Sequence, residues 1–350
     1  SGDTLDVLAQ RFNVPLADLL AVNRLTAGDS LVPDEIILIP ARLDATGPDF
    51  EIVPVSELVY SIGVAGFDTI GFVKSQGGYL SRHREFVSGA MRSGGEVVQI
   101  VADNHSISPR ILLAMLDYQS GWVSNPAAPE NKDYPLDYRN PARKGLFQQL
   151  DWLADTLNLG YYRWRDGSVT ALDFPDGTQE RIHPTLNAGT VAIQFVFSRL
   201  YEEPIWQVDV GPEGVFATYN SLFGDPFEKA IEPLIPEGLT QPDLLLPFAD
   251  GREWLFISGP HAAWGAGSPW AALDFAPPSV EGGCVKSDEW VTAPAAGVVV
   301  RSGNGVVTLD LDGDGREQSG WVIMFLHVAT EGRVPAGRTV EPGDLIGHPS

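Results

Sequence analysis

The sequence contains a single cysteine, Cys284, among 350 residues, so an intrachain disulfide is excluded. It has no uninterrupted apolar run of about 18 residues, which excludes a hydrophobic helix that spans a membrane. Basic residues are scarce, because 23 Lys and Arg stand against 46 Asp and Glu and give a formal net charge of −23. Nucleic acid and anionic lipid both require a basic face, so neither is an expected partner.

An initiating methionine and a signal peptide are also missing, so we expect the sequence to belong to a longer chain. Cys284 would then pair with a cysteine beyond Ser350 or remain a free thiol. Glycine and proline are abundant at 37 and 27 residues, which favours turn-rich β structure and linkers. The length predicts two or three domains.

The first forty residues have the pattern of a small separate unit. Asp3 or Thr4 can cap a first helix, and a second helix is predicted from Pro15 to Asn23. A short β run closed by proline follows over 36–40. Two helices this short bury little surface, so we expect a sheet partner before Ser1.

The letters GDTL, AQRFNV, LLAVNRL and IILIP in this segment resemble the LysM module, which binds N-acetylglucosamine-containing glycans such as peptidoglycan. The resemblance implies a βααβ module over 1–40 that lacks its first strand, with Asp34 where the family usually has glycine. It places a glycan groove between the 2–5 loop and the loop after Asn23. The implied glycan-binding residues are Gly2, Asp3, Thr4, Leu5 and Asn23. The alternative for Asp3 and Asn23 is that they only begin or end a helix.

The middle of the chain is predicted to be helical. We assign 41–94 to a linker and extended lead-in and 95–248 to a helical domain. Ser108 and Pro109 form a helix start, followed by an apolar helix over 110–118. Apolar periodicity predicts further helices over 145–158 and 187–201.

The phrase LAMLDYQSGW, residues 113–122, resembles the end of the catalytic helix of lytic transglycosylases and goose-type lysozymes. Those enzymes have Glu-Ser-Gly at this point, and the glutamate is the general acid. This chain has Gln119, and an amide cannot donate a proton to a glycosidic oxygen at neutral pH. The resemblance therefore implies a lysozyme-like domain without hydrolytic activity that binds glycan or acts as a spacer. An all-helical structural domain without a ligand is the alternative.

The last third, 249–350, reads as antiparallel β structure. Short β-branched or aromatic runs alternate there with Gly, Pro and Asp turns. Three polar residues stand at the ends of or inside these runs: His261, Asp274 and His327. A carboxylate flanked by Leu and Phe is costly to bury unless it is neutralised, and zinc binds both histidine nitrogen and carboxylate oxygen.

The segments GPH, ALDFA, VTAPAAGVV, FLHV and VEPGDLIG, in this order, resemble the lysostaphin-like zinc metallopeptidases, which cleave peptides of bacterial peptidoglycan. The resemblance implies that His261 and Asp274 are zinc ligands. It also implies that His327 is a catalytic histidine, which assists the attack of water or stabilises the tetrahedral intermediate.

Two departures from that family bear on the metal site. The His-x-His motif that supplies the third zinc ligand is expected beyond Ser350, and His348 comes too early to replace it. The spacing from His261 to Asp274 is longer than in the family, so an inserted loop over 265–268 must be accommodated. We therefore expect the chain by itself to bind zinc weakly or not at all and to be inactive or nearly so.

The aspartates Asp310, Asp312 and Asp314, followed by Gly315, resemble the first half of an EF-hand calcium loop. The twelfth position is Trp321, where such a loop needs a glutamate, and the flanking segments are predicted strands. A hairpin turn is the favoured interpretation, with Ca²⁺ binding as the alternative.

Together these patterns predict a multidomain α+β protein. Its predicted function is that of an extracellular or cell-envelope zinc endopeptidase, which binds peptidoglycan through its LysM module and hydrolyses peptide cross-links or stems. The alternative is a peptidoglycan-binding or regulatory protein that retains the metallopeptidase fold without hydrolysis.

Overall fold

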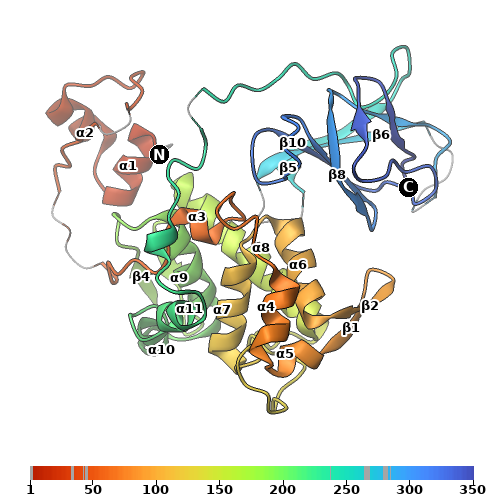
Figure 1. The fold of residues 1–350 in the computed structure, drawn as a ribbon. Helices are drawn as coiled ribbons and strands as arrows, with labels where there is room; N and C mark the ends of the chain where they lie inside the picture. The colour runs from red at the N-terminus through yellow and green to blue at the C-terminus, as the bar shows by residue number, and fades with distance from the viewer. Residues whose placement is uncertain are drawn as a thin grey trace. The chain divides into compact units, whose positions relative to one another are not determined.

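The computed structural model describes residues 3–32, 35–41, 43, 46–236, 238–263, 269–278, 283 and 285–350. Gly2, Asp34, Cys284 and the 265–268 loop lie outside these residues. The chain divides into two compact units, 1–233 with 264–269 and 234–263 with 270–350. The first is mainly helical and the second is built from strands, so the predicted α+β class is confirmed (Figure 1). Among the described helices, none is long and apolar enough to cross a membrane.

The N-terminal segment contains α1 (Leu5–Phe12) and α2 (Leu16–Asn23), as predicted. The Thr4 hydroxyl accepts the Val7 N–H at 3.2 Å and caps α1. The predicted β run over 36–40 is wrong, because no strand is assigned among its residues. Instead the Asn23 side chain hydrogen-bonds both the N–H and the carbonyl of Leu38.

The rest of the first unit is a helical domain that begins well before residue 95. Its helices are α3 (Val55–Leu58), α4 (Thr69–Gln76), α5 (Tyr79–Arg82), α6 (Gly94–His105), α7 (Pro109–Ser120), α8 (Leu146–Arg165), α9 (Ala188–Leu200), α10 (Glu203–Asp209) and α11 (Val215–Phe223). Two 3₁₀ turns, η1 (Pro141–Arg143) and η2 (Phe227–Lys229), and two hairpins, β1–β2 (Arg84–Val87, Ala90–Ser93) and β3–β4 (Ala171–Asp173, Gln179–Arg181), complete it.

The assignment of 41–94 to a linker and lead-in is therefore wrong for most of its length. Val53, Leu58, Val73 and Leu80 are buried and belong to the same hydrophobic core as the later helices. The physical reason is that α3, α4 and α5 are short and are stabilised by this packing rather than by a long local pattern.

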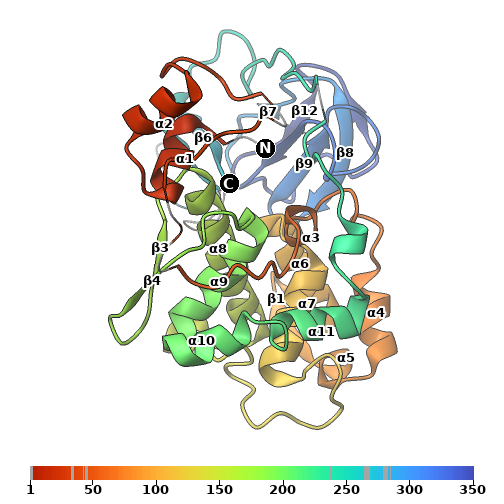
Figure 2. The same ribbon diagram turned by 90° about the vertical axis from the view of Figure 1, so that its left-hand side faces the viewer.

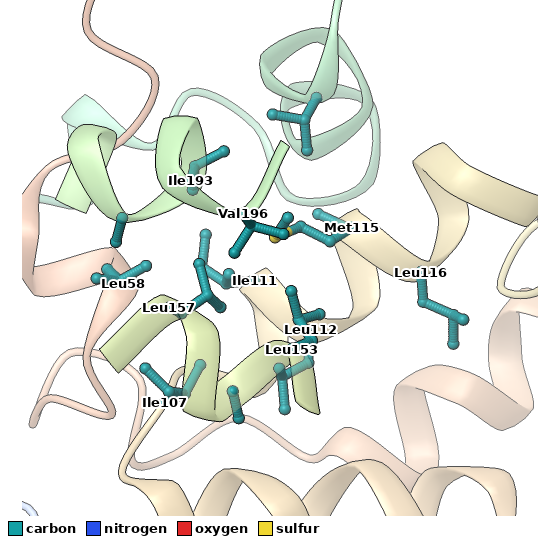
Figure 3. Close-up of a cluster of buried hydrophobic side chains, with 14 of the residues drawn as sticks. Leu58, Ile107, Ile111, Leu112, Met115, Leu116, Leu153, Leu157, Ile193 and Val196 are labelled. Carbon is teal, nitrogen blue, oxygen red and sulfur yellow. The ribbon is translucent and has the colours of Figure 1, made fainter. Parts of the chain in front are cut away.

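The centre of that core lies between α7, α8 and α9. Figure 3 shows Ile111 and Leu112 of α7 directed toward Leu157 and Leu153 of α8, and Met115 of α7 directed toward Val196 of α9. Gly160 lets α8 approach α9 closely, because a Cβ at this position would lie 2.7 Å from Cβ of Phe195. Figure 2 gives a second view of these helices.

The second unit consists of antiparallel strands. They are β5 (Leu255–Ala262), β6 (Trp270–Ala276), β7 (Val291–Thr292), β8 (Gly297–Gly303), β9 (Val306–Asp310), β10 (Val322–Phe325), β11 (Thr339–Val340) and β12 (Leu345–Gly347). One sheet has the order β10-β9-β8-β11, and two further pairs are β5–β6 and β7–β12. Val299, Val307, Leu309 and Ile346 are in its small core.

The boundary at 248 also needs correction. The Leu245 N–H donates to the Pro294 carbonyl at 2.9 Å, and the Thr292 N–H donates to the Pro247 carbonyl at 2.9 Å. Residues just before 249 are therefore bonded to the β unit, which begins at Leu234. These main-chain bonds join positions far apart in sequence, so local composition does not reveal them.

Candidate functional site

The β5–β6 hairpin brings two of the three predicted peptidase residues together. Nε2 of His261 lies 2.9 Å from Oδ2 of Asp274, and the Ser258 hydroxyl donates to the same oxygen at 2.6 Å. Ser258 pairs with Asp274 in the strand register, so the two side chains share one face of the hairpin. The side chains of His261 and Asp274 are 39% and 48% exposed, which leaves the pair open to solvent.

The second ring nitrogen of His261 is held by the main chain. Nδ1 lies 2.8 Å from the carbonyl oxygen of Ala262, to which its N–H donates. This bond and, after it, the bond to Asp274 raise the pKa of His261 above its usual value. Because the Nδ1–H is held in this way, Nε2 is the nitrogen that could bind a metal, which would replace the proton that Nε2 donates to Asp274.

The carboxylate of Asp274 is stabilised in its charged form. The hydrogen bond from Ser258 is the strongest influence and lowers the pKa of Asp274. Partial desolvation opposes this effect, while His261 and the charge of His327 lower the pKa further. His327 itself follows β10 with a left-handed φ of 58°.

The donor pair fits zinc in its chemistry and spacing. Two ligands bound tetrahedrally at about 2.0–2.1 Å would lie roughly 3.3 Å apart. Nε2 of His261 and Oδ2 of Asp274 are 2.9 Å apart, so they would have to move only slightly farther apart to bind one zinc ion. Within the described residues, however, no cluster of three metal-ligating side chains includes this pair. As zinc ligands, His261 and Asp274 would account for two of the three protein ligands that a catalytic zinc usually has.

A second acidic cluster lies in the β9–β10 connection. Oxygens of Asp310, Asp312 and Asp314 lie within 4.8 Å of one another. Antiparallel strands flank the loop, and Val322 pairs with Asp310, so the predicted strand flanks are confirmed. Glu317 is directed to Arg301, which it binds at 2.7 and 2.8 Å, and so does not join the cluster.

Asp310 organises this loop through main-chain hydrogen bonds. Its side chain is fully buried and accepts the N–H groups of Asp312 and Gly313 on Oδ1 and of Gly315 on Oδ2. The Asp314 N–H donates to the Asp312 carboxylate, and this bond by itself would lower the pKa of Asp312. Desolvation and the neighbouring Asp310 and Asp314 together outweigh the bond, so the pKa of Asp312 is raised. The loop thus has the bonding of a stable turn and also the convergent oxygens that calcium prefers.

Several residues predicted to contact glycan have structural contacts in the N-terminal segment. Oδ1 of Asp3 pairs with Nη1 of Arg11 at 2.8 Å, and Thr4 caps α1. The Asn23 amide also donates to the Leu19 carbonyl at 2.8 Å. Leu5 is buried. These contacts favour the structural alternative for Asp3 and Asn23, while glycan contact by this set stays a prediction.

Gln119 lies in a polar cluster of the helical domain. The Tyr201 hydroxyl donates to Oε1 of Gln119 at 2.9 Å and lies 3.3 Å from Oδ2 of Asp137. Burial, followed by the charge of Asp137, raises the pKa of Tyr201 to about 12. Nearby, the Tyr118 hydroxyl donates to Oδ1 of Asp209 at 2.6 Å. Asp209 is only 6% exposed, and desolvation raises its pKa.

Sequence reasoning missed Ser258, Tyr201, Asp137 and Asp209. Ser258 stands three residues before His261 in an exposed apolar run, and a strand serine by itself carries no chemical signal. Tyr201, Asp137 and Asp209 come from segments far apart in sequence, so only the packing of the helical domain brings them near Gln119 and Tyr118.

Comparison with known proteins gives two family matches. Residues 51–236, slightly more than half of the chain, match the family described as LasA, N-terminal domain. Residues 1–40 match the LysM domain. No curated protein and no solved structure matches the chain. The LysM resemblance is confirmed, whereas neither match covers the β unit.

Proposed function

The chain belongs to the LasA N-terminal domain family, and from this premise we propose that it is part of a zinc endopeptidase that binds and cleaves peptidoglycan. A LysM domain together with a LasA-type domain indicates a protein that acts at the cell wall, because LysM domains bind peptidoglycan and LasA is a staphylolytic peptidase family. Its proposed location is extracellular or in the cell envelope.

The observation that carries the enzymatic part of the proposal is the His261–Asp274 pair. An imidazole nitrogen and a carboxylate oxygen lie 2.9 Å apart on an open hairpin face, each oriented by a second hydrogen bond. Zinc bound there would polarise the scissile carbonyl and acidify a water molecule. The protein's own residues would hold it: Ser258 fixes the carboxylate, and the Ala262 carbonyl fixes the imidazole. His327 is the proposed catalytic histidine.

The LysM module would raise the local concentration of the peptidase at its polymeric substrate. A tether of this kind makes a weak affinity of a single module sufficient. We assign the helical domain, by contrast, to a non-hydrolytic role. The amide of Gln119 offers no general acid, and Tyr201 with its raised pKa is a poor replacement.

The test measures zinc content and chelator-sensitive release of amino groups from purified peptidoglycan. It uses the full-length natural protein and its Asp274→Ala variant. Stoichiometric zinc and cleavage that disappears in Asp274→Ala support the proposal. A protein that binds peptidoglycan but neither holds zinc nor releases amines would contradict it and support the second candidate, a wall-binding protein without hydrolysis.

For the Asp310 loop, the proposal keeps Ca²⁺ binding as the alternative to a hairpin turn without a ligand. The convergence of Asp310, Asp312 and Asp314 within 4.8 Å favours it. The lack of an acidic residue at Trp321 and the pairing of Glu317 with Arg301 limit the ligands available to it.

A further inference from the structure

A small cavity of about 280 Å³ lies in the β unit, at the open end of the β5–β6 hairpin. Its lining residues are Gly251, Arg252, Glu253, Trp254, Pro278 and Glu289. Trp254 directly precedes β5, and Pro278 follows the end of β6 by two residues. Neither family match includes this part of the chain.

The charges of the lining favour a cation. Two carboxylates, Glu253 and Glu289, stand against the single guanidinium of Arg252. Arg252 is a weak competitor, because its Nη1 lies 3.7 Å from Oε1 of Glu289 and its side chain is 63% exposed. A ligand with a positive charge can therefore engage carboxylate oxygen without breaking a strong ion pair.

Trp254 supplies an aromatic wall in a fixed orientation. Its ring stacks on Phe248, with centroids 4.9 Å apart and planes 9° apart, and Phe248 in turn contacts the ring of Phe275 in β6. A preoriented indole beside two carboxylates suits an ammonium group, because the ring quadrupole attracts cations.

We propose that this cavity binds the ammonium group of a peptide, with Glu253 and Glu289 as carboxylate partners and Trp254 as the aromatic wall. The inference rests on the proposed function, since the same hairpin carries His261 and Asp274. Four positions separate Asp274 from Pro278, which corresponds to roughly 13 Å of extended chain. An extended peptide at His261–Asp274 would thus reach the cavity with an amino group about four residues from the cleaved bond.

The test uses ¹H–¹⁵N spectra of the zinc-free chain, in which nine tryptophans give indole resonances. Trp254→Phe identifies the Trp254 signal. Tetra-alanine amide with a free amino terminus is titrated against the same peptide with an acetylated amino terminus. We expect a saturable Trp254 shift with the free amine and at least a tenfold weaker response with the acetylated peptide. The double variant Glu253→Gln/Glu289→Gln should also weaken binding about tenfold, and Glu341→Gln should not.

Three results would overturn the inference: no Trp254 shift at millimolar peptide, an equal response to the acetylated peptide, or an unchanged affinity in the double variant. The remaining indole resonances report whether each variant is folded. Cleavage of peptidoglycan without a Trp254 response would contradict the ammonium site and leave the proposed function supported. A specific Trp254 response in a full-length protein that neither holds zinc nor cleaves peptidoglycan supports the ammonium site and removes the proposed function.

Discussion

His261 and Asp274 face each other across a two-stranded hairpin, with Nε2 2.9 Å from Oδ2 although thirteen residues separate them in sequence. The pairing of β5 with β6 accounts for this proximity, and irregularities on both sides of Ser258 adjust the strand so that His261 reaches the carboxylate. The pair is thus assembled within one hairpin and does not depend on the four-stranded sheet.

Replacing Ser258 with alanine should weaken zinc binding. The Ser258 hydroxyl holds the carboxylate oxygen of Asp274 that faces His261, and loss of such a supporting bond typically costs about 10–100-fold in metal affinity. Competition with a chromophoric chelator measures the change in the full-length protein. Ser319→Ala, which removes a hydroxyl in the exposed β9–β10 loop, is the matched control. Equal zinc affinity in both variants would show that Ser258 does not position Asp274.

Asp310 should stabilise the β unit without any metal. Asp310→Ala leaves three main-chain N–H groups without their acceptor and should lower the free energy of unfolding by about 2–4 kcal/mol in EDTA. Asp314→Asn, at an exposed position, should change it by less than about 0.5 kcal/mol. Denaturant unfolding monitored on the β unit distinguishes them. A rise in stability with millimolar calcium that disappears in Asp312→Asn/Asp314→Asn would instead favour the calcium alternative.

Asp209 should make the helical domain less stable as pH rises. The pKa of Asp209 is raised in the folded state, so folding favours its protonated form. The protonated carboxyl therefore contributes fully to stability below the unfolded-state pKa of about 3.9, and this contribution is lost as pH rises through the higher folded-state pKa. Asp209→Asn should therefore be more stable than wild type at pH 7, by roughly 1 kcal/mol, and equal to it near pH 3. Thermal unfolding followed by far-ultraviolet circular dichroism tests this, with the exposed Asp243→Asn as control. A gain of equal size at both pH values would contradict the titration argument.

Gly160→Ala should destabilise the packing of α8 on α9. The added Cβ would lie 2.7 Å from Cβ and 3.0 Å from Cγ of Phe195, which overpacks the core at a cost of about 1–3 kcal/mol. Except at its lower end, this cost exceeds the gain of roughly 1 kcal/mol that alanine brings to a helix interior. Gly66→Ala is the control, since no neighbouring atom lies within 4 Å of its Cβ position. A Gly160→Ala protein as stable as wild type would mean that α9 moves away at little cost.

The long helices could be predicted because their signals are local. The expected helix over 110–118 is α7, Pro109–Ser120, with Pro109 in its first turn as its chemistry indicates. Ser108 stands at the N-cap position, but its side chain makes no cap hydrogen bond. The helices α3 and α5 have only four residues each, too few for a periodic pattern, so the sequence of 41–94 does not reveal them. Leu58 of α3 and Leu80 of α5 belong to the same core as residues of α6 and α7, and sequence alone does not reveal this packing.

The candidate site was predictable in its residue types and not in its supporting contacts. A carboxylate inside an apolar strand identified Asp274, and the structure pairs it with His261. Nothing in the sequence ties Ser258 to that carboxylate, since the bond depends on strand register. Likewise, Asp3 appears in the glycan-binding pattern, whereas its ion pair with Arg11 depends on the helical spacing of α1.

In the segment after α2, the Asn23 amide group accepts the Leu38 N–H and donates to the Leu38 carbonyl. The Asn23 side chain therefore makes the two main-chain hydrogen bonds at Leu38 that a neighbouring β-strand would otherwise make. In a β-sheet, such bonds would recur at further residues along the strand. Leu25, Leu31, Ile37 and Ile39 also pack against the small core of α1 and α2. Loss of the Asn23 side chain would therefore remove both main-chain bonds at Leu38 at once, while these apolar contacts would remain.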